Sequence, residues 1–280
     1  MKTIGIVGLG LIGGSLGLDL RALGYRVIGV SRKQQTCQRA MERGAVDTAT
    51  TQLAVLQQAD LVFLCTPLGV MAETVREMRP HLQEDTVLTD VGSVKGWVVQ
   101  TIAPLWPNFV GGHPMAGTAE SGIESAQRRL FVGAPYVLTP IETTPSAVVD
   151  QVEQVVRPLG TQLYCCQPEI HDQAVAWISH LPVMVSSSLI HACLGEASTA
   201  VLSLAKQLAS SGFRDTSRVG GGNPELGVMM ARYNQDALLE TLRCYRQSLE
   251  QLEQLIQQGA WDQLEQELLE TQQGRPEFIK

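Results

Sequence analysis

The chain has 280 residues, a length that suggests two domains or one large domain, and 44% of its residues are hydrophobic while 18% are charged. This composition is typical of a globular protein and excludes a disordered or collagen-like chain. The formal net charge is −7, so no overall positive field attracts nucleic acid or an anionic membrane. Apolar runs are short and glycines interrupt the N-terminal one, so we expect neither a membrane span nor a signal peptide but a cytoplasmic protein.

The first half of the chain alternates short apolar runs with helix-length segments. Seven runs rich in Val, Ile and Leu are expected to be buried strands, at 3–7, 27–30, 61–65, 86–88, 108–110, 135–138 and 162–164. Helical patterns lie between the early runs, at 12–23, 34–43, 70–78 and 94–103. This alternation predicts an α/β domain at 1–166, with a doubly wound, mostly parallel sheet of the Rossmann type.

A glycine motif joins the first predicted strand to the first predicted helix. Gly8, Gly10 and Gly13 form GxGxxG in the strand–helix context that a dinucleotide site requires. Gly8 permits the tight turn, Gly10 lets the backbone approach a pyrophosphate, and Gly13 lets helix and strand pack closely. Leu11 and Ile12 complete this turn, where the helix N-terminus attracts phosphates. We therefore predict a dinucleotide cofactor.

The end of the second predicted strand bears on which dinucleotide binds. An NAD site places an acidic residue there, about 20 residues after the motif, to bind the ribose 2′-OH. Here Ser31, Arg32 and Lys33 follow the strand, and no Asp or Glu occurs between Asp19 and Glu42. Ser31 can hydrogen-bond a 2′-phosphate, and Arg32 can stack on adenine or pair with that phosphate. The pattern favours NADP, with ordinary solvated charges as the alternative for Arg32 and Lys33.

Polar residues follow three later strands, at the carboxyl edge where such sheets bind ligands. Thr66 and Pro67 are assigned to the cofactor site, with a plain turn as the alternative. Ser93 and His113 can converge near a nicotinamide. Histidine suits a general base near neutral pH, and the His113–Pro114 step after two glycines indicates an exposed loop. We predict catalysis by His113, with a structural role as the alternative. The six cysteines show no metal-ligand spacing, so no metal site is expected.

Strand patterns give way to helical patterns in the second half, at 167–280. Helix-length segments at 171–190, broken by Pro182, and at 194–209 precede a predicted glycine-rich loop at 210–224. A long amphipathic helix is predicted by apolar residues at steps of three and four, from Leu238 to Ile256, and the stripe continues after Gly259. These helices have more leucine side chains than one small layer of helices can bury. The excess predicts a homodimer formed through the helical domain.

Five segments together resemble the prephenate/arogenate dehydrogenase family of tyrosine biosynthesis: GLGLIGGSL, TDVGSVK, GGHPMAGT, HDQAVAWISHLP and FRDTSRVGGGNPEL. The resemblance covers nearly the whole chain. It implies an enzyme that oxidises a 1-carboxy-cyclohexadienol. Hydride passes from the ring carbon bearing the hydroxyl to NAD(P)⁺, the hydroxyl loses its proton, and the ring carboxylate leaves as CO₂. The product is an aromatic phenol, which makes the reaction effectively irreversible.

The resemblance also implies roles for residues of the matching segments. His113 accepts the proton of the ring hydroxyl, and Ser93 hydrogen-bonds that hydroxyl or His113. Arg218 grips a substrate carboxylate, for which its planar fork is well suited. His180 and Thr118 belong to the substrate pocket.

The chain departs from the family pattern directly after Thr118. Many relatives carry an acidic residue where this chain has Ala119, and Glu120 is offset by one, so an acidic gating role is not carried over. His171 is expected to support its helix.

The leading prediction is an NADP-dependent arogenate dehydrogenase that forms L-tyrosine. A prephenate dehydrogenase giving 4-hydroxyphenylpyruvate is the alternative, because the two substrates differ only in a side-chain ammonium or ketone. A hydroxyacid dehydrogenase would use a lysine base from the helical domain, where Lys206 is the only lysine before the terminal Lys280. A non-catalytic NADP-binding sensor would bind the cofactor without turnover.

Overall fold

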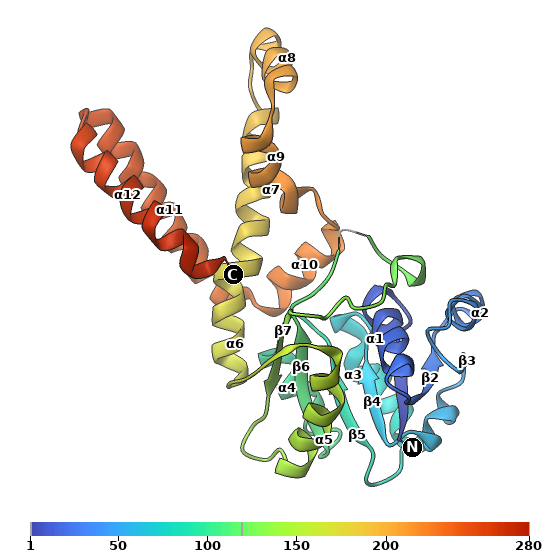
Figure 1. Ribbon diagram of the computed structural model, residues 1–280. Coiled ribbons are helices and arrows are strands. Elements are labelled where there is room, and N and C mark those ends of the chain that lie inside the picture. The colour runs from blue at the N-terminus through green and yellow to red at the C-terminus, as the bar shows by residue number, and fades with distance from the viewer. Residues whose placement is uncertain (1, 119, 280) are drawn as a thin grey trace. The chain divides into compact units, whose positions relative to one another are not determined.

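The computed structural model describes residues 2–118 and 120–279, so Ala119 lies outside the described residues. Eight strands form one sheet in the order β3-β2-β1-β4-β5-β6-β7-β8 (Figure 1). They are β1 (Thr3–Val7), β2 (Arg26–Val30), β3 (Thr48–Thr50), β4 (Leu61–Leu64), β5 (Val87–Asp90), β6 (Phe109–Pro114), β7 (Pro135–Thr139) and β8 (Gln162–Cys165). Strands β1 to β6 run parallel, and β7 runs antiparallel to β6. The order of the first six strands is that of the Rossmann fold, which confirms the predicted fold class.

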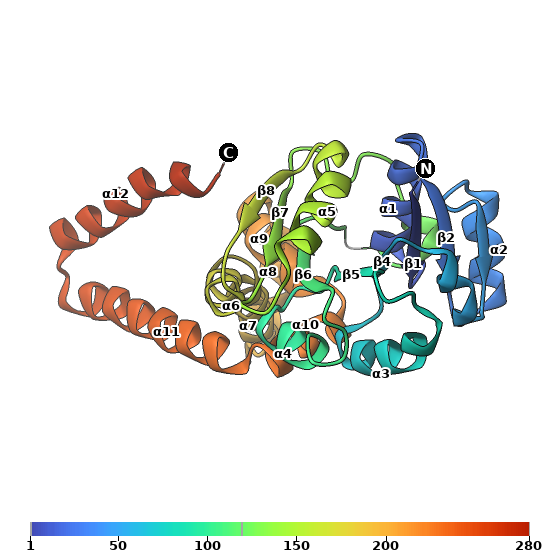
Figure 2. The same cartoon turned by 90° about the horizontal axis from the view of Figure 1, so that it is seen from below.

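Helices cover both faces of the sheet (Figure 2). The helices of this part are α1 (Leu11–Ala22), α2 (Gln34–Glu42), α3 (Leu68–Met78), α4 (Gly96–Ile102) and α5 (Ser146–Val156). Leu16 of α1 and Val152 of α5 belong to one core cluster with Ile6 of β1. Met71 of α3 and Val98 of α4 belong to a second cluster on the other face. Strand β3 and helix α5 were not among the predicted elements.

One continuous helical run begins the second half of the chain. It consists of α6 (Pro168–Val175), a π-helical turn (Ala176–His180) and α7 (Leu181–Leu194). The prediction that Pro182 breaks the helix was wrong. Proline lacks an N–H and clashes with the preceding turn, but the wider π turn lies directly before it and Pro182 sits at the start of α7.

Helices also occupy the segment that was predicted to be a glycine-rich loop. After α8 (Thr199–Leu208) come α9 (Ser211–Ser217), a 3₁₀ turn at Arg218–Gly221, and α10 (Pro224–Tyr233). The prediction of a loop was wrong, because Gly220 allows the 3₁₀ turn to pack closely against α7. A Cβ on Gly220 would lie 2.5 Å from the backbone nitrogen of Ser187 in α7.

The chain divides into two units, residues 1–234 and residues 235–280. The second unit consists of α11 (Gln235–Gln258) and α12 (Trp261–Phe278), which confirms the predicted long amphipathic helix. The two helices are joined at Gly259, whose φ is +64°, and Gln251 Nε2 donates to Glu267 Oε1 at 2.8 Å. Helices α6 to α10 belong to the unit that contains the sheet, so the predicted boundary at 166/167 does not coincide with this division.

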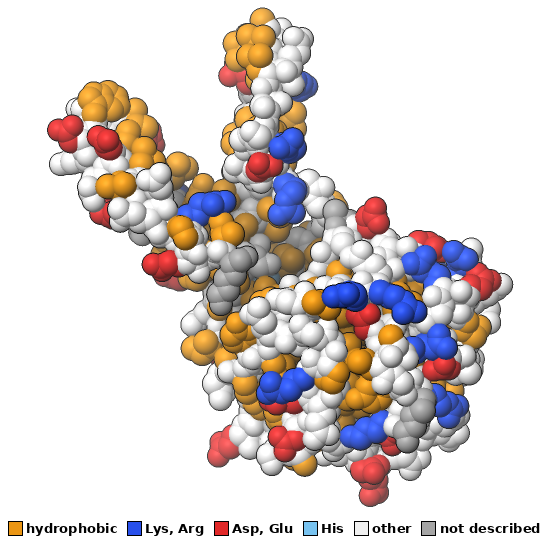
Figure 3. Space-filling view, in the orientation of Figure 1, with side chains coloured by type: hydrophobic (Ala, Val, Ile, Leu, Met, Phe, Trp, Pro, Cys, Tyr) orange, Lys and Arg blue, Asp and Glu red, His pale blue; other side chains and the backbone are white. Residues whose placement is uncertain are grey.

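Apolar side chains lie exposed on the helices of both units (Figure 3). In the first unit Leu208 is 68% exposed and Val228 is 64% exposed. In the second unit Trp261 and Leu268 are 62% and 55% exposed. Large apolar side chains exposed in this way are typical of interaction surfaces where they form a contiguous patch.

Among the described residues, the helix Pro168–Leu194 is long and apolar enough to cross a membrane, judged by length and composition alone. The helix carries His171, Asp172 and His180, which are buried inside the protein. The Asp172 carboxylate accepts the Lys95 backbone N–H at 2.7 Å, which ties α6 to the sheet domain. Because polar residues are expensive in lipid and these are used in contacts within the fold, we interpret this helix as part of the folded domain.

Candidate active site

The predicted cofactor and catalytic residues lie at one edge of the sheet. Gly8 follows β1, Thr66 follows β4 and Ser93 follows β5, while His113 lies near the end of β6. Strands β1 and β4 are adjacent in the sheet, and the strand order reverses between them. A crevice at the carboxyl ends of the strands, at such a reversal, is where doubly wound sheets bind their ligands.

The glycine motif has the geometry that a dinucleotide needs. Gly8 has φ +105°, and a Cβ there would lie 2.5 Å from the Cys65 carbonyl oxygen. A Cβ on Gly13 would lie 2.0 Å from the Gly8 carbonyl oxygen, so strand and helix meet here only without a side chain. Gly10 has open space around it, and no side chain caps α1 among the described residues. Leu11 and Ile12 form the first turn of α1, whose free N–H groups suit a pyrophosphate.

The cationic residues that sequence analysis assigned to the cofactor follow β2. Ser31 follows β2 and is partly buried, and its N–H donates to the Thr50 carbonyl at 3.2 Å. Arg32 and Lys33 are exposed immediately before α2. The Thr66 hydroxyl is buried without a hydrogen-bond partner among the described residues, as expected of a group that meets a ligand. Pro67 is exposed and occupies the N-cap position of α3.

A buried ion pair holds the backbone directly before His113. Strand β6 pairs with β5 only as far as Val110. Beyond that point Asp90 Oδ1 accepts the Gly112 N–H at 3.0 Å, and Lys95 Nζ donates to the Gly112 carbonyl at 2.7 Å. Asp90 and Lys95 also form an ion pair, and both side chains are fully buried. Burial lowers the pKa of Lys95, while Asp90 opposes that shift. Sequence analysis missed this pair.

His113 is buried in β6, only 7% exposed, which corrects the prediction of an exposed loop. Its Nδ1 lies 2.8 Å from Nε2 of His171, and the two rings meet edge to face. Burial, followed by the nearby His171, Lys95 and His180, holds the pKa of His113 well below its ordinary value. The imidazole is therefore neutral at pH 7 and has a lone pair available for a proton.

Asp172 joins several parts of the site. Its carboxylate accepts the backbone N–H groups of Lys95 at 2.7 Å and Gly96 at 2.8 Å, at the beginning of α4. The same carboxylate lies 2.8 Å from Nδ1 of His171. A Cβ on Gly96 would lie 2.9 Å from Asp172 Oδ2, so glycine leaves room for this contact. A carboxylate is well placed near the positive end of a helix.

His180 is fully buried and supplies an unused nitrogen. Asn234 Nδ2 donates to the Asp172 carbonyl at 2.8 Å and lies 3.2 Å from His180 Nδ1. Since the Asn234 amide nitrogen donates, Nδ1 accepts and the proton of a neutral His180 lies on Nε2. This Nε2 has no partner among the described residues. Mainly through burial, the pKa of His180 is lowered to about 4, so His180 is a neutral donor at pH 7.

Three predicted site residues form no hydrogen bond to His113 in the described part of the chain. Ser93 is partly buried after β5. Thr118 is exposed, and its hydroxyl accepts the Glu120 N–H at 3.3 Å. Arg218 is exposed at the start of the 3₁₀ turn beside α7. The structure therefore brings together His113, His171 and Asp172, of which sequence analysis assigned only His113 to catalysis.

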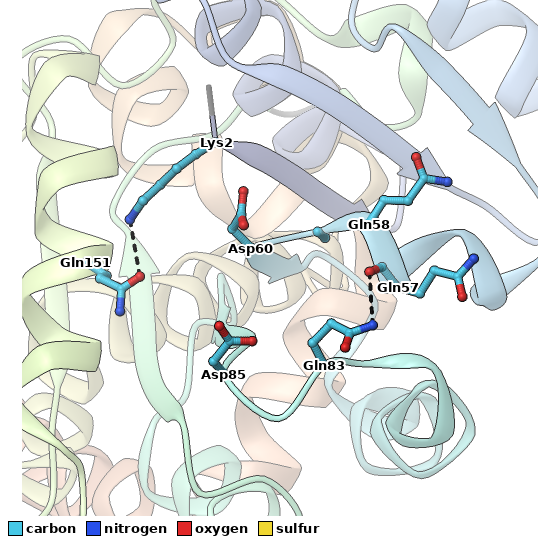
Figure 4. Close-up of a pocket in the computed structure, with 8 residues that line it drawn as sticks. Lys2, Gln57, Gln58, Asp60, Gln83, Asp85 and Gln151 are labelled. Carbon is cyan, nitrogen blue, oxygen red and sulfur yellow. Dashed lines mark hydrogen bonds between the residues drawn. The ribbon is translucent and has the colours of Figure 1, made fainter.

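A polar pocket of about 200 Å³ lies at the opposite edge of the sheet (Figure 4). Lys2, Asp60 and Asp85 line it together with several glutamines, at the amino ends of β1, β4 and β5. Lys2 Nζ donates to Gln151 at 3.2 Å, and Asp60 accepts the Thr3 N–H at 2.7 Å. Doubly wound sheets bind ligands at the carboxyl ends of their strands, so this pocket is not the active site.

Comparisons with known proteins agree with the fold. Residues 16–165 match the family model "Prephenate dehydrogenase, nucleotide-binding domain", and residues 167–270 match "Prephenate dehydrogenase, dimerization domain". Cyclohexadienyl dehydrogenase of Zymomonas mobilis is 32% identical over 280 residues, which cover 98% of this chain and 95% of that protein.

Two solved structures are similar over 99% of the chain. Synechocystis arogenate dehydrogenase is 54% identical, with a TM-score of 0.90 and 100% of that chain covered. Prephenate dehydrogenase from A. aeolicus, in complex with hydroxyphenyl propionate and NAD⁺, is 29% identical, with a TM-score of 0.93 and 98% of that chain covered.

Proposed function

The chain belongs to the prephenate dehydrogenase family, and from this premise we propose that it is an arogenate dehydrogenase, which converts L-arogenate to L-tyrosine by NADP-dependent oxidative decarboxylation. The observation that carries the catalytic proposal is the buried, neutral His113 beside His171, at the carboxyl edge of the sheet. Arogenate is proposed as the substrate because the 54% identical Synechocystis structure is that of an arogenate dehydrogenase.

The proposed chemistry asks little of the protein beyond positioning and proton transfer. His113 accepts the proton of the ring hydroxyl as that carbon becomes a ketone. When bound, a nicotinamide cofactor would supply the acceptor for the hydride of the same carbon. The cross-conjugated dienone then accepts the electron pair of the bond to the carboxyl group, CO₂ leaves, and the ring becomes aromatic. Ser93 is proposed to hydrogen-bond the ring hydroxyl or His113.

The anionic groups of the substrate require donors that the site supplies. The unpartnered Nε2–H of His180 is proposed to bind a substrate oxygen, because a buried donor without a partner is costly. Arg218 is proposed to grip a carboxylate through its guanidinium fork. Thr118 is proposed to belong to the same pocket.

The cofactor proposal rests on the glycine turn and on the missing acidic residue after β2. Gly8, Gly10, Leu11, Ile12 and Gly13 are proposed to hold the pyrophosphate. Ser31, Arg32 and Lys33 are proposed to hold the 2′-phosphate of NADP, and Thr66 and Pro67 to border the cofactor beyond β4. The exposed Arg32 and Lys33 support NADP rather than NAD, because the position holds cations and no acid that would repel a phosphate.

We further propose residues 1–166 as the NADP-binding domain and residues 167–280 as the substrate and dimerisation domain of a cytoplasmic homodimer. The dimerization-domain match at 167–270 supports this proposal. The exposed apolar side chains of α8 to α12 also support it, as does an apolar pocket of about 460 Å³ between α7 and α10, lined by residues such as Met184 and Leu226.

One experiment tests the proposed function: turnover of two substrates with each of two cofactors. Arogenate with NADP⁺ is expected to give NADPH and tyrosine at the highest kcat/KM. Preference for prephenate would show that the chain is a prephenate dehydrogenase instead. Cofactor binding without any turnover would favour a non-catalytic NADP-binding sensor. A hydroxyacid dehydrogenase would use a lysine base from the helical domain. This alternative is disfavoured because Lys206 is exposed on α8.

Replacing Arg218 by alanine is expected to raise KM for arogenate about 10- to 100-fold with little change in kcat. Charge-assisted hydrogen bonds to a carboxylate contribute about 1.5–3 kcal/mol to binding. Steady-state kinetics measures both constants. Arg157→Ala is the matched control, since Arg157 is an exposed arginine paired with Glu153 on α5 and its neighbouring turn. An unchanged KM in Arg218→Ala would show that Arg218 is an ordinary solvated surface charge and does not bind the substrate.

Replacing Arg32 by alanine is expected to weaken NADP⁺ binding at least about tenfold while NAD⁺ binding changes little, because only NADP⁺ carries the 2′-phosphate. Calorimetric titration with each cofactor measures the two dissociation constants. Arg26→Ala is the control, since Arg26 is an exposed arginine at the amino end of the same strand, bonded to Gln58 at 3.0 Å. Equal losses for both cofactors in Arg32→Ala would remove the NADP assignment.

A further inference from the structure

His113 is the first member of a hydrogen-bonded chain that runs from β6 into α6. His113 Nδ1 lies 2.8 Å from His171 Nε2, and His171 Nδ1 lies 2.8 Å from Asp172 Oδ1. The three residues are 7%, 2% and 8% exposed. Bulk water therefore does not compete for these hydrogen bonds, and His113 Nδ1 and both nitrogens of His171 are satisfied by their neighbours in the chain.

The direction of each hydrogen bond follows from Asp172. A carboxylate only accepts, so Nδ1 of His171 must be the donor. In a neutral imidazole the second nitrogen is then a bare acceptor, and Nε2 of His171 accepts from His113. The proton of neutral His113 consequently lies on Nδ1, and its Nε2 carries a free lone pair.

The Asp172 carboxylate at the far end of this chain is itself held in place. Asp172 accepts the backbone N–H groups of Lys95 and Gly96 at 2.7 and 2.8 Å. These backbone donors cannot rotate away as a side chain can. The orientation of Asp172, and with it the proton on His171 Nδ1, is set by the backbone at the start of α4.

We propose that His171 and Asp172 are positioning residues that hold His113 in the tautomer whose Nε2 is bare, so that this atom accepts the proton of the substrate hydroxyl. The inference rests on the proposed function, in which His113 is the base. The opposite tautomer presents an N–H at Nε2 and cannot accept a proton there. In the step itself the hydroxyl proton moves to Nε2, and the O–H electron pair becomes part of the new carbonyl as the ring carbon gives up its hydride to the oxidised nicotinamide cofactor of the proposed function. His113 thereby becomes an imidazolium. The Nδ1–H of that imidazolium still donates to Nε2 of His171, whose own proton remains on Nδ1 and is donated to Asp172.

The tautomer is measured directly on the full-length protein with ¹⁵N-labelled histidine and no substrate, by long-range ¹H–¹⁵N correlation spectra at pH 7. The chain has five histidines, and the signals of His113 are identified by their loss in His113→Gln. His113 and His171 are both expected to show a protonated Nδ1 and an unprotonated Nε2. A protonated Nε2 on neutral His113 would overturn the proposal. This readout does not depend on any turnover, so it stands even if arogenate and prephenate both prove not to be substrates.

Two substitutions at His171 test the effect on the reaction. In His171→Leu the Nδ1–H of His113 loses its acceptor, so the Nε2–H form is expected to gain population and kcat to fall about 10- to 100-fold, as when other partners that orient a functional imidazole are removed. In His171→Gln the side-chain oxygen can accept from His113, and much of kcat and of the original tautomer signal is expected to return. The NADP⁺ dissociation constant is expected to stay unchanged in both variants.

His191→Leu is the matched control, because His191 lies on the same helical run and is exposed. Its kcat and its His113 spectrum are expected to match those of the unsubstituted chain. If His171→Leu leaves both kcat and the His113 tautomer unchanged, His171 only fills space. If His171→Leu does not fold, the spectrum of the unsubstituted chain and the comparison with His171→Gln decide the proposal.

Discussion

Replacing His113 by alanine is expected to lower kcat for arogenate by about 10²–10⁴-fold, because general-base assistance contributes a factor of that size. Alanine leaves a void in β6, so His113→Gln is the second variant, which keeps most of the volume and can still donate to His171. Both variants are expected to bind NADP⁺ as the unsubstituted chain does, since His113 is not among the cofactor residues. Single-turnover and steady-state kinetics measure the loss. Rates near those of the unsubstituted chain in both variants would dismiss the assigned role.

His113 is also expected to determine how kcat/KM for arogenate declines at acidic pH. His113 acts as a base only when neutral, and burial together with His171, Lys95 and His180 holds its pKa well below 6.5. As the pH falls, kcat/KM for arogenate should therefore stay level through 6.5 and decline only in the range well below it. A decline centred at or above 6.5 would show that His113 is not held neutral in this way. His113→Gln should lose this acidic decline.

The parts of the fold and site that could be predicted depend on short-range patterns. Strand β1 and the turn from Gly8 to Gly13 carry their own signals, because a buried apolar run and glycines at fixed spacing determine local geometry. The residues that follow the parallel strands could be placed at one edge for the same reason, since parallel strands all end on the same side. Ser93 and His113 were assigned to that edge on this argument.

The parts that could not be predicted depend on contacts between distant segments. His113 and His171 are 58 residues apart, and no spacing rule links a strand end to a histidine on a later helix. The one signal was the pair His171–Asp172, two ionisable residues together at the start of an apolar helix. Gly220 was misinterpreted because the sequence shows a glycine but not the backbone of α7 against which it packs. The burial of Lys95 could not be predicted either. Lysine is almost never buried unless it is paired, and the sequence does not show that Lys95 pairs with Asp90.

Replacing Lys95 by methionine is expected to lower the free energy of unfolding by about 3–5 kcal/mol, the usual effect of leaving one member of a buried ion pair without its partner. Lys95 and Asp90 are both fully buried, so Asp90 would remain in the interior with its charge uncompensated. Methionine keeps the length of the side chain, so little of the loss comes from a cavity. Urea denaturation followed by circular dichroism measures the change. Because Lys95 Nζ also holds the Gly112 carbonyl, kcat is expected to fall as well.

The controls separate the buried ion pair from a general effect of removing a cation. Arg76→Met breaks the exposed pair between Arg76 and Glu73 and is expected to change the free energy of unfolding by less than about 1 kcal/mol. The double variant Lys95→Met with Asp90→Asn removes both charges but leaves an amide oxygen to accept a backbone N–H, so it is expected to be more stable than Lys95→Met alone. If Lys95→Met is no less stable than Arg76→Met, the ion pair does not hold this part of β6. The position of His113 would then depend on its pairing with β7 and on His171 alone.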